Sequence, residues 1–311
     1  MNSSPERPMR FILLVPVGPR PCDVIGVSEL CEGAVAHSEG ADLEIWCLND
    51  GNDPAVLAAI AQRHRLAYRI LPHPFAGRGN HWLGRLTAGL VHGMRLIAAE
   101  RPDDWHVLRM DTDALIVGPW ERRLFAIAQD KRYGLIGSNE LGNEGRQMRG
   151  DWWGTRLYRH SKWISRADHG PGMRVAWRRS SRILTRTIRT AFAQGGRNIR
   201  NINGGIYLMP AHALACLNGL PLFQPELCFQ INSFTEDVVM GLCVHAAGLK
   251  FLLHNNPGDT IASSWQGLAA PTLPALVASG CGLIHSIKDH SPFREEETRA
   301  FFRARRQSID H

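Results

Sequence analysis

The chain has 311 residues, of which 44% are hydrophobic, and carries a formal net charge of +7. This length and composition predict a sizeable core, in one large α/β domain or two small ones. They argue against a transmembrane helix, because no segment offers about 18 uninterrupted apolar residues. The apolar run at residues 11–17 is too short for the core of a signal peptide, so none is expected.

The first 140 residues alternate apolar runs with helical segments. Strands are predicted at residues 11–15, 43–48, 68–71 and 105–110, and helices at 24–36, 55–63 and 82–99. Asp53-Pro54 supports the second helix, as an N-cap followed by a first-turn proline. This β-α-β-α-β rhythm is typical of a doubly wound sheet, in which ligands bind at the carboxyl ends of the strands. The loops after Val15, Leu48 and Met110 are therefore expected to converge.

The second half of the chain is less regular. Strands are predicted at residues 134–137, 206–209 and 250–253, and helices at 238–247 and 291–307. Asn203-Gly204-Gly205 reads as a turn before the second of these strands, and Gly248 is placed to end the first helix. The last helix has its glutamates early and its arginines late, in agreement with the helix dipole.

Two carboxylates follow the strand at residues 105–110, in the triplet Asp111-Thr112-Asp113. Carboxylates two residues apart at the end of a strand form a hard oxygen-donor site for a divalent cation. An Asp-x-Asp triplet is also a common turn sequence, so the motif needs support from elsewhere in the chain.

A basic segment lies between residues 146 and 200, which contain fourteen Lys or Arg against only Asp151 and Asp168. The segment also carries four tryptophans (Trp152, Trp153, Trp163 and Trp177). Its apolar side chains recur at helical spacing, with arginines around them, at Met173, Trp177, Leu184, Ile188 and Phe192. Three interpretations stay open: peripheral contact with an anionic membrane, an arm or lid that packs on the main domain, and contact with an anionic glycan acceptor.

The order of motifs resembles the GT-A glycosyltransferase superfamily, over roughly residues 10–290 apart from the basic insert. These motifs are a first strand, an Asp after the second strand, Asp-x-Asp, a Gly-Gly segment, Glu-Asp opening a helix, and a late His. The phrase at residues 234–242, which contains Glu236-Asp237, is the most specific part and is similar to the Glu-Asp motif of inverting members. The Gln-x-x-Arg-Trp signature of processive synthases is absent, which favours transfer of a single sugar.

The resemblance implies an α/β fold with a Rossmann-like mixed sheet flanked by helices. It implies one GT-A domain over residues 1–290, in which 1–140 bind the nucleotide-sugar, 141–202 are the basic Trp-rich insert and 203–290 form the acceptor and catalytic half. Residues 291–311 would add a C-terminal helix.

The resemblance also implies the donor site. Asp111, Asp113 and His285 would hold Mn²⁺ or Mg²⁺, and Asp111 would also contact the donor. Further donor contacts would come from the main chain of Pro16 and Val17, from Asp50 to the base of a UDP-sugar or a comparable donor, and from Arg78, Gly204, Gly205 and Lys288. Each has a plain structural alternative, since Asn49-Asp50-Gly51 is also a turn sequence and a lone His is usually structural.

Asp237 is the expected general base, because an inverting transfer needs a carboxylate that takes the proton of the acceptor hydroxyl. Glu236 would orient the acceptor or the backbone. Acidic residues in the first turn of a helix also stabilise it without any catalysis. A retaining transferase and a sugar nucleotidyltransferase stay open as alternatives.

The expected partners are a nucleotide-sugar donor and a glycan or lipid-linked acceptor. A nucleic-acid binder would leave the four carboxylates unexplained. The seven cysteines are scattered and show neither CxxC nor CxH spacing, which favours reduced thiols in a cytoplasmic protein, with or without peripheral attachment to the inner face of the membrane. They are Cys22, Cys31, Cys47, Cys216, Cys228, Cys243 and Cys281.

Overall fold

The structure is a computed structural model of the whole chain. It describes residues 8–76, 82–101, 104–139, 171–195, 202–230, 234–256, 258–264, 267–290 and 292–308. Of the predicted features, Arg78 and most of the basic insert, including Trp152, Trp153 and Trp163, lie outside these residues.

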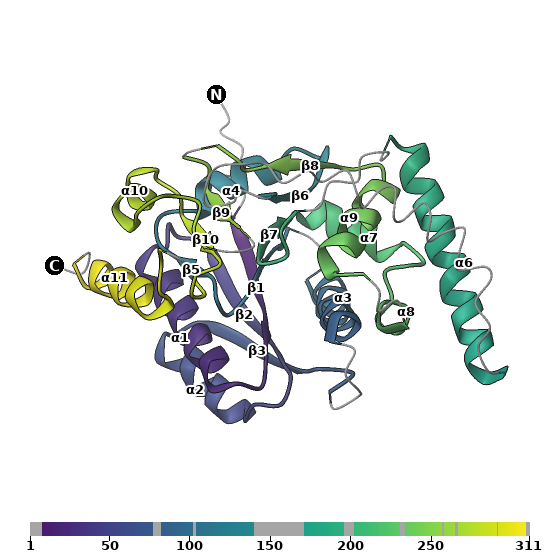
Figure 1. Cartoon of the computed structure of the whole chain (residues 1–311), viewed down its shortest axis with the longest axis horizontal. Coiled ribbons are helices and arrows are strands. Elements are labelled where there is room, and N and C mark those ends of the chain that lie inside the picture. Colours follow the sequence, from purple (N-terminus) through teal and green to yellow (C-terminus); the bar gives the residue numbers. More distant parts are fainter. Residues whose placement is uncertain are drawn as a thin grey trace.

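A seven-stranded mixed sheet forms the centre of the molecule, in the order β3-β2-β1-β4-β7-β6-β8 (Figure 1). Its strands are β1 (Arg10–Val17), β2 (Asp42–Asn49), β3 (Ala67–Pro72), β4 (His106–Met110), β6 (Tyr133–Gly137), β7 (Ile206–Met209) and β8 (Lys250–Leu253). Neighbouring strands pair in parallel, except that β7 runs antiparallel to β4 and β6. All seven strands coincide with predicted ones.

Helices cover both faces of this sheet and build two separate cores. One core packs α3 (Trp82–Glu100), α6 (Pro171–Ala193), α7 (Ala211–Asn218), α8 (Pro225–Gln230) and α9 (Glu236–Ala246) on one face. The other core packs α1 (Pro21–Ala36), α2 (Pro54–Arg63) and α4 (Glu121–Ala128) on the opposite face. The expected α/β fold, a Rossmann-like mixed sheet flanked by helices, is confirmed.

A second, three-stranded sheet lies beside the carboxyl end of β4, in the order β5-β10-β9. It consists of β5 (Leu115–Ile116), β9 (Ile261–Ser263) and β10 (Leu283–His285), and it packs with α10 (Leu273–Ala278) and α11 (Glu295–Gln307). Because β5 follows the Asp-Thr-Asp triplet and β10 ends at His285, this small sheet carries the late histidine to the triplet.

The site edge of the large sheet follows from its strand order. The order reverses at β1, which has β2 on one side and β4 on the other, and ligands bind at such points. The antiparallel β7 brings its first residue to the end of β4, since Ile206 pairs with Met110. Gly205 therefore meets Asp111, whose N–H donates to the Gly205 carbonyl at 2.9 Å.

The apolar stripe of the basic segment packs on the main body of the protein. Leu184 and Ile188 of α6 are buried in the core that α6 shares with α9, whereas Arg182, Arg186 and Arg189 are exposed. This part of the stripe agrees with the interpretation that the segment is an arm or lid that packs on the main domain. The side chains of Met173 and Trp177 lie outside the described residues. Within the described part of the chain, no helix combines the length and the apolar character needed to span a bilayer.

The packing of α6 predicts that Ile188→Ala destabilises the protein. Ile188 is 1% exposed, so truncation leaves a cavity that costs about 2–5 kcal/mol of unfolding free energy. Chemical denaturation measures this loss, with Arg189→Ala as the control, since that neighbouring side chain is exposed and its removal changes stability by about 0.5 kcal/mol or less. Equal stabilities of the two variants would contradict the packing of α6 on α9.

Candidate metal and nucleotide-sugar site

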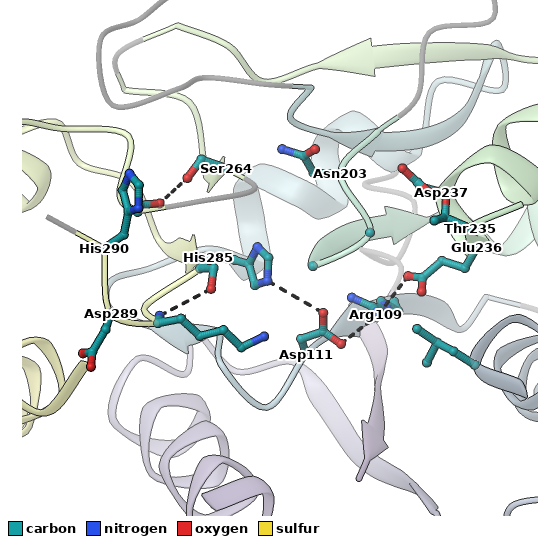
Figure 2. A pocket seen from close by; sticks show the side chains of 16 residues that line it. Arg109, Asp111, Asn203, Thr235, Glu236, Asp237, Ser264, His285, Asp289 and His290 are labelled. Atoms are coloured by element: carbon teal, nitrogen blue, oxygen red, sulfur yellow. Dashed lines mark hydrogen bonds and ion pairs between the residues drawn. The ribbon is translucent and has the colours of Figure 1, made fainter. Parts of the chain in front are cut away.

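Three predicted metal ligands meet at the edge of the large sheet. His285 Nε2 lies 3.7 Å from Asp111 Oδ2 and 3.4 Å from Asp113 Oδ2. One ligand atom from each residue lies within 4.8 Å of the other two. Figure 2 shows Asp111 and His285 pointing toward each other from the two sheets. Two carboxylates and an imidazole in this arrangement suit Mn²⁺, and suit Mg²⁺ less well.

The His285 ring is fixed by contacts on two sides. Its Nδ1 lies 3.2 Å from the hydroxyl of Ser263 on β9, which leaves Nε2 facing the carboxylates. On the other side the ring lies against Gly205, where a Cβ atom would come within 2.0 Å of Nδ1 and Cε1. A second contact that orients a metal-binding histidine commonly strengthens metal binding, because it holds the ring in the binding geometry. Gly205 thus makes room for the imidazole.

The same contact predicts that Gly205→Ala displaces His285. The methyl group overlaps the ring, so we expect a loss of about 1–3 kcal/mol in unfolding free energy and a weaker affinity for Mn²⁺. Gly219→Ala is the matched control, since a Cβ there would have its nearest neighbour at 3.5 Å. Denaturation and Mn²⁺ titration of both variants measure the effect, and a Gly205→Ala protein that binds Mn²⁺ like the wild type would contradict it.

Asp113 is held as an anion. It is 7% exposed, its Oδ2 accepts from the Ser286 hydroxyl, and Lys288 Nζ lies 3.2 Å from the same oxygen. Burial alone would raise the pKa of Asp113, but the hydrogen bond and charge of His285, together with Lys288 and Ser286, outweigh it and hold the pKa well below its usual range. The carboxylate is therefore available as a ligand at any physiological pH.

Thr112 between the two aspartates anchors the triplet from behind. Its hydroxyl donates to Asp23 Oδ1 at 2.8 Å, and its carbonyl accepts from Arg299 Nη2 of α11 at 3.4 Å. Gly26 of α1 approaches so closely that a Cβ there would lie 2.1 Å from the same carbonyl oxygen. Arg299 also pairs with the buried Glu29 of α1. The C-terminal helix α11 therefore contacts both α1 and the Asp-Thr-Asp triplet.

The charged side chains around the triplet favour the binding of a divalent cation. The carboxylates of Asp111, Asp113, Glu236 and Asp237 line the two cavities, and among the described residues Arg109 and Lys288 are the Arg or Lys side chains that pair with any of them. Arg109, buried in β4, pairs with Asp111 and Glu236, and Lys288 pairs with Asp113. A divalent cation beside these carboxylates would offset part of their negative charge, in agreement with the geometry of the triad.

Two cavities adjoin at the triplet. One, of about 440 Å³, is lined by the loops after β1, β2 and β4; the other, of about 490 Å³, is lined by the Gly-Gly turn, the start of α9 and the segment after β10. Asp111, Lys288 and Leu86 line both cavities. The expected convergence of the loops after Val15, Leu48 and Met110 is confirmed. Cavities of this size commonly hold small-molecule ligands.

The first cavity contains most of the predicted nucleotide-binding residues. Pro16, Val17, Asp50, Asp111 and Lys288 all line it, and Asp50 N–H donates to the Val17 carbonyl at 3.0 Å. The Asp50 carboxylate pairs with Arg85 of α3, a residue for which the sequence pattern gave no signal.

Two further residues of this cavity were not predicted. Arg20 lies at the N-terminus of α1 and lines the cavity. His73 is buried in the wall of the same cavity. Its Nδ1 accepts from Phe75 N–H, and its Nε2 lies 3.0 Å from the Arg85 carbonyl. His73 thereby fixes the first turn of α3, which carries Arg85.

The second cavity contains the predicted Gly-Gly and Glu-Asp residues. Gly204, Gly205, Glu236 and Asp237 all line it. The two glycines also have a packing role inside the protein, because a Cβ at Gly204 would lie 2.7 Å from Glu236 Oε1, just as Gly205 makes room for His285. Figure 2 shows Glu236 turned toward Arg109.

The two acids of the Glu-Asp motif have different surroundings. Burial raises the pKa of Glu236, whereas the charge of Arg109 opposes this shift and favours the ionised form. Burial also raises the pKa of Asp237, against the opposing hydrogen bond from Thr235. Asp237 Oδ1 is buried and has no hydrogen-bond partner among the described residues.

No family model and no curated protein matches the chain. Among solved structures, it is similar to the apo structure of WbbM, a bifunctional glycosyltransferase, with a TM-score of 0.54 at 9% identity; the match covers 100% of this chain and 52% of WbbM. The chain therefore spans about half the length of that protein. This likeness shows that the chain shares the fold of that protein.

Two further matches have lower scores. The galactosyltransferase LgtC, in complex with donor and acceptor sugar analogues, matches with a TM-score of 0.49 at 13% identity, over 97% of this chain and 96% of LgtC. Mouse xyloside xylosyltransferase 1 in its apo form matches with a TM-score of 0.41 at 11% identity, over 80% and 85%.

Proposed function

We propose that the chain is a metal-dependent glycosyltransferase. It moves a single sugar from a nucleotide-sugar, with UDP-sugars as the favoured class, to a saccharide or a lipid-linked saccharide. The observation that carries this proposal is the meeting of two cavities at Asp111, beside a triad suited to Mn²⁺ or Mg²⁺. One cavity suits the nucleotide and the other the acceptor, so the transferred sugar would lie at their junction.

The proposed donor site follows from the lining of the first cavity. The base lies against the main chain of Pro16 and Val17, with Asp50 and its partner Arg85 at its edge. A bound metal ion would neutralise charge on the diphosphate, and Lys288, which lines both cavities, adds a positive charge at their junction. Arg78 remains a predicted donor contact outside the described residues.

The proposed reaction inverts the anomeric carbon. Asp237 takes the proton of the acceptor hydroxyl as its oxygen attacks the anomeric carbon, and the bond from that carbon to the diphosphate oxygen breaks. The nucleoside diphosphate leaves with the bonding electrons. Asp237 lines the second cavity, and its Oδ1 has no hydrogen-bond partner among the described residues, which supports this assignment.

The raised pKa of Asp237 predicts an acid limb in the pH profile. A general base acts only when ionised, so kcat/KM should fall as the pH drops through the pKa of Asp237, which lies above the ordinary value for an aspartate of about 4. Rates measured at saturating Mn²⁺ between about pH 4 and 9 test this expectation. The limb should disappear in Asp237→Asn, and a limb that persists there would assign it to another group.

Domain boundaries and cellular setting remain proposals. Residues 1–290 would form one catalytic domain, with 141–202 as a basic insert and 291–311 as a C-terminal helix.

All seven cysteines are free thiols, which supports a cytoplasmic protein. The exposed arginines of α6 would supply any peripheral contact with an anionic membrane, by charge rather than by insertion of the buried stripe.

A thermal-shift screen tests the proposed function. UDP-, GDP- and CMP-sugars are each added with and without Mn²⁺, and the expected result is Mn²⁺-dependent stabilisation by one nucleotide class, since a ligand that binds the native state raises its melting temperature. The stabilising sugar is then offered with saccharide acceptors, and NMR determines the anomeric configuration of the product. Absence of stabilisation by every nucleotide would contradict the proposal.

A further inference from the structure

Arg109 is a wholly buried arginine that joins the metal triplet to the Glu-Asp motif. Its side chain is 1% exposed, and Nη2 lies 2.8 Å from Asp111 Oδ1 and 2.7 Å from Glu236 Oε1. Figure 2 shows Asp111 between Arg109 and His285. The two carboxylates come from positions that are 125 residues apart in the chain but share one guanidinium nitrogen.

The Asp111 carboxylate is oriented by this contact. Its Oδ1 pairs with Arg109, and its other oxygen, Oδ2, lies 3.7 Å from His285 Nε2. A guanidinium is always charged and holds a carboxylate in a defined direction, so it fixes which oxygen is left for the ion. An arginine also repels a cation, however, and a buried arginine beside a metal site would weaken that site unless a second anion offsets its charge.

Glu236 supplies a second carboxylate, and the charge of Arg109 beside it favours its ionised form. It is 5% exposed, its Oε1 is paired with Arg109, and the Gly204 backbone lies against the same oxygen. Asp237 differs from it, since it forms no ion pair in the described part of the chain, whereas Glu236 pairs with Arg109. The two neighbouring acids therefore face different tasks.

We propose that Arg109 and Glu236 are positioning residues for the metal ion. Arg109 holds Asp111 so that Oδ2 faces the ion, and Glu236 balances the charge of Arg109. This inference rests on the proposed function only for the presence of the ion. It assigns Glu236 to the support of the metal site, in place of the role of orienting the acceptor that the resemblance implied. Asp237 is then the one acid of the motif left to act on the acceptor.

A calorimetric titration of the full chain with Mn²⁺ alone tests this assignment, because it measures the Kd for Mn²⁺ directly. Glu236→Gln keeps the shape of the side chain and removes its charge, and Arg109→Lys keeps a charge but cannot bridge two carboxylates in the same way. Each should raise the Kd for Mn²⁺ about 10–100-fold, the usual effect of removing a contact that supports a metal ligand. Asp237→Asn removes an equal charge from the adjacent residue and should change the Kd less than about 3-fold.

The two substitutions act through one contact, so their effects should not add. The double variant Arg109→Lys/Glu236→Gln should bind Mn²⁺ no more than a few-fold more weakly than the worse single variant. Thermal unfolding confirms that each variant is folded, and Glu236→Gln, the mildest change, decides the matter if Arg109→Lys does not fold.

Turnover gives a second readout that separates positioning from catalysis. At saturating Mn²⁺, Glu236→Gln should recover most of the wild-type kcat while its apparent KM for Mn²⁺ stays raised. A kcat that stays low at saturating Mn²⁺ and acceptor would return Glu236 to the acceptor and overturn the inference, as would an unchanged Kd for Mn²⁺. A wild-type chain that binds no Mn²⁺ would remove the metal site itself, whereas tight Mn²⁺ binding without any sugar transfer would overturn only the proposed function.

Discussion

Asp113→Asn is expected to abolish Mn²⁺-dependent sugar transfer. Asp113 is the most strongly ionised acid of the triad, and its Oδ2 lies 3.4 Å from His285 Nε2. Loss of a metal ligand removes several kcal/mol of stabilisation from the leaving diphosphate, so kcat/KM should fall by about 10³-fold or more. Initial rates across a range of Mn²⁺ concentrations measure this fall, and the stabilisation of the chain by Mn²⁺ should disappear with it.

Asp130→Asn is the control for this substitution, since Asp130 is half-buried, lies outside the lining of both cavities and pairs with Arg132 beside it. It should keep wild-type rates and Mn²⁺ binding. Wild-type transfer by Asp113→Asn at low Mn²⁺ would show that the triad does not hold the catalytic ion.

Asp237→Asn is expected to lower kcat by about 10²–10⁴-fold, the range that general-base catalysis supplies. Binding of Mn²⁺ and of the donor nucleotide should be largely unchanged, because Asp237 lines only the cavity assigned to the acceptor. Single-turnover rates, together with nucleotide binding measured by thermal shift, separate the chemical step from binding.

Glu226→Gln controls for the alternative that Asp237 only stabilises its helix. Glu226 is an exposed acid in the first turn of α8, outside the lining of both cavities, and occupies the same helical position as Asp237 in α9. Its replacement should change stability by about 0.3–1 kcal/mol and leave kcat as it is. Full activity of Asp237→Asn, or a product that retains the donor's anomeric configuration, would rule out Asp237 as the base of an inverting transfer.

The large sheet could be predicted because each of its strands is a short apolar run that is visible in the local sequence. Of the run at residues 105–110, β4 comprises His106–Met110, which are all buried. Asp53-Pro54 caps α2 as its sequence indicates, with Asp53 accepting from Ala55 N–H. Gly248 follows α9 with a positive φ, as expected of a residue that ends a helix. Such signals depend only on neighbours along the chain.

Features that depend on distant contacts could not be predicted in this way. The helices α4, α7, α8 and α10 are six to eight residues long, which gives periodicity little room to show. Arg85 sits in a helix with nothing in the sequence to connect it with Asp50. Arg109 stands out as a charge in a buried strand, but its pairing with Glu236 depends on β7 bringing the Gly-Gly turn and α9 beside β4.

The contacts of the site were predicted better than the reasons for them. The resemblance placed Asp111, Asp113 and His285 around one ion, and the structure brings them together. The resemblance implied that Gly204 and Gly205 contact the donor. The structure adds a reason for glycine at both positions, since both lie against side chains of the site itself, Glu236 and His285.

Anomalous diffraction from a crystal grown with Mn²⁺ and UDP tests the central claim most directly. The account predicts one manganese peak, bound by carboxylate oxygens of Asp111 and Asp113 and by His285 Nε2, with the uracil in the cavity lined by Pro16, Val17 and Asp50. A manganese peak elsewhere, or none at saturating Mn²⁺ with UDP bound, would contradict the account.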